Sequence, residues 1–178
     1  MKGILEIVQV NEEAEPSFEV WLRRTILASE SASPSDGFEF KHVRDQLTPA
    51  GSVPPPAHWP IPADSESNLA QALPWYLEQF VHQPTEMGAQ RAQYVLRALQ
   101  DWGKDVFSNL FTTDHARSAY DTLADSSLSQ RNRIEIHSAD PQVLAWPWEV
   151  LIDHHDCPVG RMMAVERRYG IALQGPNG

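Results

Sequence analysis

The spacing of apolar residues changes along this chain, and that change limits the folds it can adopt. Phe18, Val20 and Leu22 fall on every second position, which is typical of a half-buried strand. The shorter apolar run Ile4–Val10 precedes them, and the polar stretch Asn11–Pro16 lies between. Together these three segments predict a β-hairpin near the start of the chain.

Beyond residue 68 the apolar period becomes helical. We predict helices over residues 69–81, 87–111 and 114–128, followed by a strand at 133–138. Pro74 is expected in the first turn of the first helix, where proline is tolerated. Gly103, inside the second helix, is expected to permit close packing. The apolar stripe of the first helix consists of Leu69, Ala72, Leu73, Tyr76, Leu77, Phe80 and Val81.

A proline-rich segment separates the strands from the helices. Thr48–Pro62 holds six prolines in fifteen residues, and each proline fixes φ and removes an amide donor. We therefore expect no regular element there, and interpret residues 48–67 as a stiff surface loop.

Charge and composition exclude several classes of protein. The net charge is −10, from 24 acidic and 14 basic residues, which argues against binding to nucleic acid or to an anionic membrane. No apolar stretch reaches the ~18 residues of a membrane span. The single cysteine, Cys157, cannot form an intramolecular disulfide, so a cytoplasmic location is expected. Nucleotide-binding and zinc-protease signatures are missing, and no cofactor is expected.

Residues of the metal-ligand type cluster at one place, Asp153–Cys157 (DHHDC). Histidine and cysteine can bind a transition metal, and a cysteine beside a histidine can form a thiol nucleophile. However, five consecutive side chains are expected to point in divergent directions. We interpret the segment as a polar loop, with a metal or thiol site at His154–Cys157 as the less favoured hypothesis. Of the other histidines, His137 is expected to be partly buried.

Two tryptophans around a proline precede that loop. Trp146, Pro147, Trp148 and Glu149 predict a buried packing bend, because each indole N–H needs a partner when it is buried. Glu149 is expected either at the surface or hydrogen-bonded to backbone amides.

At this bend the sequence resembles the CHAT family of caspase-like domains. Leu144–Asp153 (LAWPWEVLID) is similar to the family's "PWE.LyD" signature, and Leu73–Glu78 (LPWYLE) resembles its "WYLE" helix start. Trp102–Phe111, Arg133–Ile136 and Met163–Arg168 resemble further segments in the same order. The resemblance implies the α/β class, as a three-layer caspase-like sandwich that is incomplete here. Residues 1–47 would form an N-terminal β-rich segment, and residues 68–178 the N-terminal half of a CHAT-like domain.

The resemblance also implies a function. CHAT domains often act as cysteine endopeptidases, with a histidine and a cysteine at neighbouring strand ends. Both family motifs lie beyond the tryptophan bend, and no residue here matches either of them. We therefore assign no catalytic, cofactor or metal residue, only a structural signature: Trp146, Pro147, Trp148, Glu149 and Asp153.

Two functional hypotheses follow from that assignment. In the first, the chain is the N-terminal half of a CHAT-type peptidase, inactive alone and completed by the remainder of the domain. In the second, it is a non-enzymatic interaction or regulatory module with a protein partner.

Overall fold

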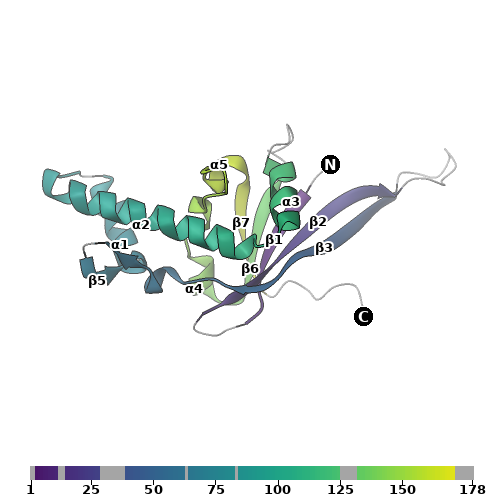
Figure 1. The fold of residues 1–178 in the computed structure, drawn as a ribbon, viewed down its shortest axis with the longest axis horizontal. Helices are drawn as coiled ribbons and strands as arrows, with labels where there is room; N and C mark the ends of the chain where they lie inside the picture. Colours follow the sequence, from purple (N-terminus) through teal and green to yellow (C-terminus); the bar gives the residue numbers. More distant parts are fainter. Residues whose placement is uncertain are drawn as a thin grey trace.

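The computed structural model describes residues 3–11, 15–28, 39–62, 64–82, 84–124 and 132–170. Its centre is a five-stranded mixed sheet in the order β3-β2-β1-β6-β7 (Figure 1). Neighbours β1–β2 and β2–β3 pair antiparallel, whereas β1–β6 and β6–β7 pair parallel. These strands are β1 (Gly3–Gln9), β2 (Ser17–Ala28), β3 (Glu39–Ser52), β6 (Arg133–Ser138) and β7 (Ala164–Tyr169). The predicted hairpin and the strand at 133–138 are confirmed.

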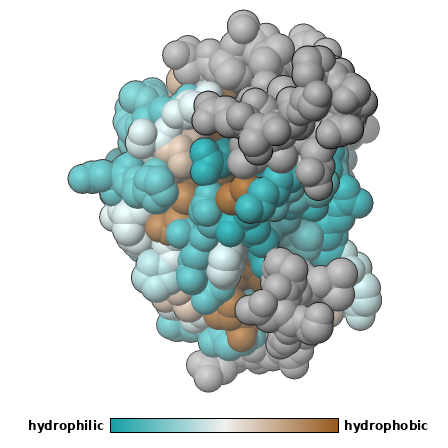
Figure 2. Space-filling view, turned by 90° about the vertical axis from the view of Figure 1, so that its right-hand side faces the viewer, coloured by the Kyte–Doolittle hydropathy of each residue, from teal (hydrophilic) through white to brown (hydrophobic). Residues whose placement is uncertain are grey.

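Helices and short elements fill the connections between the strands. The long helix α2 crosses the sheet and extends beyond it together with α1, on the side opposite the projecting β2–β3 hairpin (Figure 1). Viewed from the hairpin side, the described surface is mostly hydrophilic with small hydrophobic patches (Figure 2). The elements are η1 (Pro56–His58), β4 (Pro60–Ile61), β5 (Asp64–Asn68), α1 (Leu69–Pro74), η2 (Trp75–Phe80), α2 (Glu86–Leu110), α3 (Asp114–Ala124), α4 (Pro141–Leu144), η4 (Trp148–Val150) and α5 (Val159–Met162).

Local capping defines where several of these helices begin. Thr85 and Thr113 accept hydrogen bonds from the backbone N–H groups of Gly88 and Ala116, and Asp140 accepts one from Gln142. The predicted second and third helices are confirmed as α2 and α3. Residues 125–128 of the third prediction lie outside the described residues, as does the C-terminal stretch 171–178.

One face of the sheet forms the core with the helices. Leu5 and Ile7 of β1 and Ile134 and Ile136 of β6 are fully buried there, because alternate strand residues point to the same face. They join a single apolar cluster with side chains from α2, α3, α4 and η4: Val95, Trp102, Val106, Phe107, Leu110, Tyr120, Val143 and Trp148.

The opposite face of the sheet is charged. Its alternate positions place Glu6 and Glu135 in the centre, where both are buried under arginine side chains. We call the following residues the charged face: Glu6, Arg23, Arg44, Arg133, Glu135, His137, Glu166 and Arg168. The α/β class is thus confirmed, but within the described ranges the helices pack on one face and give two layers, not the expected three. Ionised groups at these positions offer no apolar surface for another helix layer.

The proline-rich segment is more ordered than predicted. β3 continues to Ser52, and η1, β4 and β5 follow within residues 48–67, so the expectation of no regular element was wrong. From the pair Phe18–Gly51 to the pair Val20–Thr48, β2 advances by two residues, whereas β3 advances by three. The extra residue of this bulge falls at Pro49–Ala50. An edge strand tolerates proline at a bulge because no ladder hydrogen bond is needed there.

The first helix differs from its prediction at Pro74. Asn68 caps α1, so Pro74 is the sixth helical residue rather than a residue of the first turn. Proline lacks an N–H and crowds the preceding turn, and the chain widens into the π-helical turn η2, in which Val81 N–H donates to the Tyr76 carbonyl. The change in helical period moves the predicted stripe off the core. Leu69 and Ala72 are buried, whereas Leu77 and Val81 are more than half exposed, at 54% and 55%.

Gly103 confirms the expected close packing. A Cβ atom there would lie 2.4 Å from the Val150 carbonyl oxygen, and Ile152 N–H donates to the Gly103 carbonyl at 3.3 Å. Both contacts hold α2 against the segment that follows the tryptophan bend.

Gly103→Ala should therefore destabilise the fold. Alanine gains roughly 1 kcal/mol of helix propensity, but separating two backbones costs more, so we expect a net loss of about 2 kcal/mol. Urea unfolding measures it. Ser108→Ala, at an exposed site of the same helix, should change stability by only a few tenths of a kcal/mol. A Gly103→Ala variant more stable than the wild type would contradict the close approach.

Candidate functional site: a groove beside the tryptophan bend

The tryptophan bend is buried, as predicted. Trp148 is fully buried, and its indole N–H donates to the Val143 carbonyl at 2.8 Å. Its ring meets Phe18 edge-on with centroids 5.5 Å apart and stacks on Trp146, also at 5.5 Å. Trp146 is only half-buried and packs edge-on against Trp102. The bend therefore joins the sheet to α2 through four aromatic rings.

Arg167 of β7 ties this bend to the edge of the sheet. Its guanidinium pairs with both carboxylate oxygens of Glu149 and donates to the carbonyls of Leu144 and Trp146. Burial raises the pKa of Glu149, but the hydrogen bond and charge of Arg167 outweigh it, so that pKa lies below its ordinary value. From the sequence we expected Glu149 either at the surface or hydrogen-bonded to backbone amides. Its pairing with Arg167 was not predicted, because no local sequence pattern relates residues that lie 18 positions apart.

Asp153, the last residue of the structural signature, stabilises the local structure. Its carboxylate is buried and accepts hydrogen bonds from the Tyr120 hydroxyl and from the backbone N–H groups of His155 and Cys157, each at 2.9 Å. Burial and the Asp153 charge raise the pKa of Tyr120, which stays a neutral donor. Asp153 thus fixes the following turn and anchors it to α3.

A groove of about 610 Å³ opens beside the bend, between α1–η2 and the crossover from β6 to β7. Its wall includes the exposed Leu77, and Glu78 and Glu149 supply carboxylates. The described lining contains no Ser, Thr, Cys, His or Lys, so it offers apolar contact and negative charge but no hydroxyl, thiol, imidazole or amine nucleophile. The lining residues are Pro56, Ala57, Ala70, Leu73, Pro74, Leu77, Glu78, Gln142, Ala145, Trp146, Pro147, Glu149 and Arg167.

Two side chains of the ligand-type cluster, those of His154 and His155, converge, contrary to expectation, whereas Asp153 and Asp156 diverge toward Tyr120 and Lys104. His154 and His155 both bring Nε2 to the Asp121 carboxylate of α3, at 3.2 and 3.4 Å. The turn between Asp153 and Cys157, with Asp156 at a φ of 61°, reverses the chain enough for consecutive side chains to meet. Sequence spacing gave no signal for Asp121, which lies 33 positions before His154.

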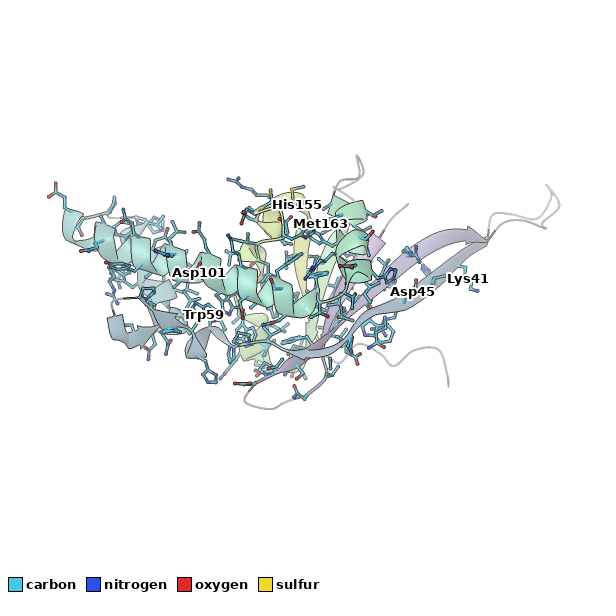
Figure 3. All side chains as sticks on the ribbon, in the orientation of Figure 1. Lys41, Asp45, Trp59, Asp101, His155 and Met163 are labelled. Carbon is cyan, nitrogen blue, oxygen red and sulfur yellow. The ribbon has the colours of Figure 1, made fainter. Side chains whose placement is uncertain are left out.

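Cys157 and the neighbouring histidines lie away from the edge where caspase-type chemistry is expected. Their turn precedes α5 and the start of β7, and Figure 3 labels His155 on it. The carboxyl ends of the parallel strands carry Gln9, Ser138 and Tyr169 instead. His137, half-buried as predicted, bonds to Glu135 on the charged face. Among the described residues, no cysteine and histidine meet at those strand ends.

No protein-family model, curated protein sequence or solved structure matches this chain. Among the residues that the structure describes, no helix is both long enough and apolar enough to cross a membrane. The resemblance to CHAT domains therefore rests on the residues quoted above.

Proposed function

We propose that this chain is a protein-interaction module built on the N-terminal half of a CHAT-type caspase-like domain, without peptidase activity of its own. Its groove beside Trp146 would bind a short segment of a partner protein. The observation that carries the proposal is an apolar groove next to the signature bend whose described lining holds no hydroxyl, thiol or amine nucleophile. Its volume falls within the range of roughly 300–1,000 Å³ that is typical of binding pockets.

The chemistry of the groove favours a particular kind of segment. Trp146, Pro147 and Pro74 give it rigid apolar walls that lose little entropy on binding, and Leu77 already exposes its side chain. Arg167 is engaged by Glu149 and two carbonyls, so it is a poor anchor for an anion. Glu78 is exposed and has no ion pair within the described ranges. A segment with an apolar side chain beside a Lys or Arg therefore fits best.

The arrangement of strands supports the caspase-like part of the proposal. Three adjacent parallel strands, β1, β6 and β7, present their carboxyl ends along one edge, which is where α/β folds place their reactive groups. The described residues at that edge lack the histidine and cysteine that the family uses. A scaffold of this kind can hold a partner without cleaving it.

Leu77→Lys tests the groove. Panning a random-heptapeptide phage library against the full chain should enrich sequences that pair apolar with basic residues, and a labelled peptide of that sequence provides a binding assay. Placing a positive charge in the apolar wall removes apolar contact and repels the basic residue, and should weaken binding on the order of tenfold or more. Leu96→Lys is the matched control, because Leu96 is an exposed leucine of α2 outside the groove, and it should leave binding unchanged.

Three results would contradict the proposal. If no peptide is enriched, or if both leucine variants lose binding equally, the groove is not the binding site. If the purified chain cleaves casein, and the Cys157→Ala variant does so equally well, the chain carries a peptidase that is not based on thiol chemistry and the non-catalytic assignment is wrong.

A second candidate function rests on β7. Among the described residues this strand pairs only with β6, and Tyr169 is highly exposed at its end, so a further parallel strand could extend the sheet. This candidate is the peptidase half that the remainder of a CHAT domain completes. Co-expression with a polypeptide that carries the family's histidine and cysteine motifs should then restore peptidase activity, and its failure to do so would leave the groove proposal standing alone.

A further inference from the structure

The turn at residues 153–157 is built so that two consecutive histidines face one carboxylate. Asp153 holds the turn by accepting two backbone N–H groups, and its other oxygen accepts the Tyr120 hydroxyl. Tyr120 is the residue before Asp121 on α3, so the same carboxylate also fixes the distance between the turn and Asp121. The three side chains come from two segments that the tertiary fold brings together.

The distances between these side chains match those of a metal-binding triangle. The ligand atoms of Asp121, His154 and His155 all lie within 4.8 Å of one another, and the two Nε2 atoms lie 3.2 and 3.4 Å from the carboxylate. In a tetrahedral zinc site with bonds of about 2.0–2.1 Å, neighbouring ligand atoms are roughly 3.3 Å apart. The fourth position can be taken by water, because the side chains of His155 and Asp121 are largely and partly exposed.

Packing restricts the first histidine. The His154 ring lies 6.0 Å from Phe107 and 6.3 Å from Tyr120, and 4.0 Å from the His155 ring. Lys104 of α2 pairs with Asp156 rather than with Asp121. Among the described residues, no lysine or arginine pairs with the Asp121 carboxylate.

A second cluster of ligand-type side chains lies on the charged face. Glu6, Glu135 and His137 also bring three ligand atoms within 4.8 Å of one another. There, however, Arg23 and Arg44 pair with Glu6, and Arg23, Arg133 and Arg168 pair with Glu135. Four guanidinium groups already neutralise those carboxylates and would repel a metal ion. Of the two clusters, only that of Asp121 is left without arginine partners in the described structure.

We propose that Asp121, His154 and His155 bind one divalent transition-metal ion, with Zn²⁺ as the best fit to two imidazole nitrogens and one carboxylate. The ion would clip the last turns of α3 to the loop that leads into α5. This site is independent of the groove, and its role would be structural, because it joins two segments at the edge where the parallel strands begin.

Zinc titration of the untagged full chain tests the proposal. After chelation and desalting, calorimetry with ZnCl₂ should show one ion per chain, and zinc should raise the thermal unfolding midpoint. His154→Gln, His155→Gln and Asp121→Asn should each weaken zinc affinity on the order of 100-fold. The matched control is Asp114→Asn with His115→Gln, an exposed pair on the same helix, which should leave affinity unchanged. Co²⁺ in place of zinc should show the visible absorption of a four-coordinate ion.

Three outcomes would overturn the assignment. The first is that the wild type binds no zinc even when zinc is in excess. The second is that the three ligand variants bind zinc as tightly as the wild type, and the third is that the control pair weakens zinc binding as much as the ligand variants do. Circular dichroism of each variant without metal shows whether it is folded. A folded wild type that takes up no zinc rejects the site without reference to any variant.

Discussion

Replacing Trp148 with alanine should lower the free energy of unfolding by about 4 kcal/mol, the largest effect we expect from a single core substitution. The ring is fully buried between Phe18 and Trp146, so its removal leaves a cavity that rigid aromatic neighbours cannot fill. The Val143 carbonyl also loses its indole donor and keeps the bond from the Trp146 N–H at 3.2 Å, which adds the cost of one buried hydrogen bond. Urea unfolding followed by circular dichroism measures the change.

Trp21→Ala provides the comparison for that measurement. Trp21 is half-buried on the charged face under the Arg44 guanidinium, 4.4 Å from its ring centre, and its loss should cost about 1–2 kcal/mol. Trp148→Phe keeps an aromatic ring but loses the hydrogen bond, and remains informative if the alanine variant does not fold. Equal effects of Trp148→Ala and Trp21→Ala would mean that the bend is not the packing centre described here.

Glu135→Gln should destabilise the chain by about 2–3 kcal/mol at pH 7. Glu135 is 1% exposed and accepts from Arg23 and Arg133 at 2.8 Å, so glutamine would leave these guanidinium groups with less compensating charge. The expected cost is below that of breaking a fully buried pair, because the arginine side chains are partly exposed. Glu166→Gln, at a partly exposed carboxylate of the same face, should cost less than about 1 kcal/mol.

The pH dependence of that difference gives a sharper test. Burial raises the pKa of Glu135, but the hydrogen bond from Arg133 and the charges of Arg23, Arg133 and Arg168 bring it below its ordinary value of 4.5. The folded state therefore binds this proton more weakly than the unfolded state. Its stabilisation is complete above about pH 4.5 and is lost as the pH falls through the lower folded pKa. The stability gap between the wild type and Glu135→Gln should accordingly shrink below pH 4.5.

Like Glu135, His137 should make the folded state less stable as the pH falls, but it does so at a higher pH. Burial lowers its pKa from the ordinary 6.5, although Glu6 and Glu135 oppose that shift. The stability of the wild type relative to a His137→Gln variant should therefore begin to fall as the pH falls below about 6.5, before Glu135 contributes. A difference that instead grows in favour of the wild type between pH 6.5 and 4.5 would contradict this arrangement of the charged face.

Local sequence patterns predicted most of the elements. The period of two in Phe18–Leu22 and the helical period of α2 each report on one element, and capping residues such as Thr113 and Asp140 act over two or three positions. The tryptophan bend was predictable for a similar reason, because two indoles around a proline have few other places than the core. Pro74 shows the limit of such patterns: a single residue at the sixth helical position altered the period and exposed Leu77.

The sequence alone therefore predicted the hairpin, α2, α3, the strand β6 and the burial of the bend at Trp148. Which charges meet depends instead on the tertiary fold, which pairs Arg167 with Glu149, Arg23 with Glu135, and Asp121 with two consecutive histidines. These partners lie 18 to 112 positions apart. Hydrophobic periodicity is set by neighbours along the chain, whereas a contact across the sheet depends on strand order and register, which no local pattern encodes.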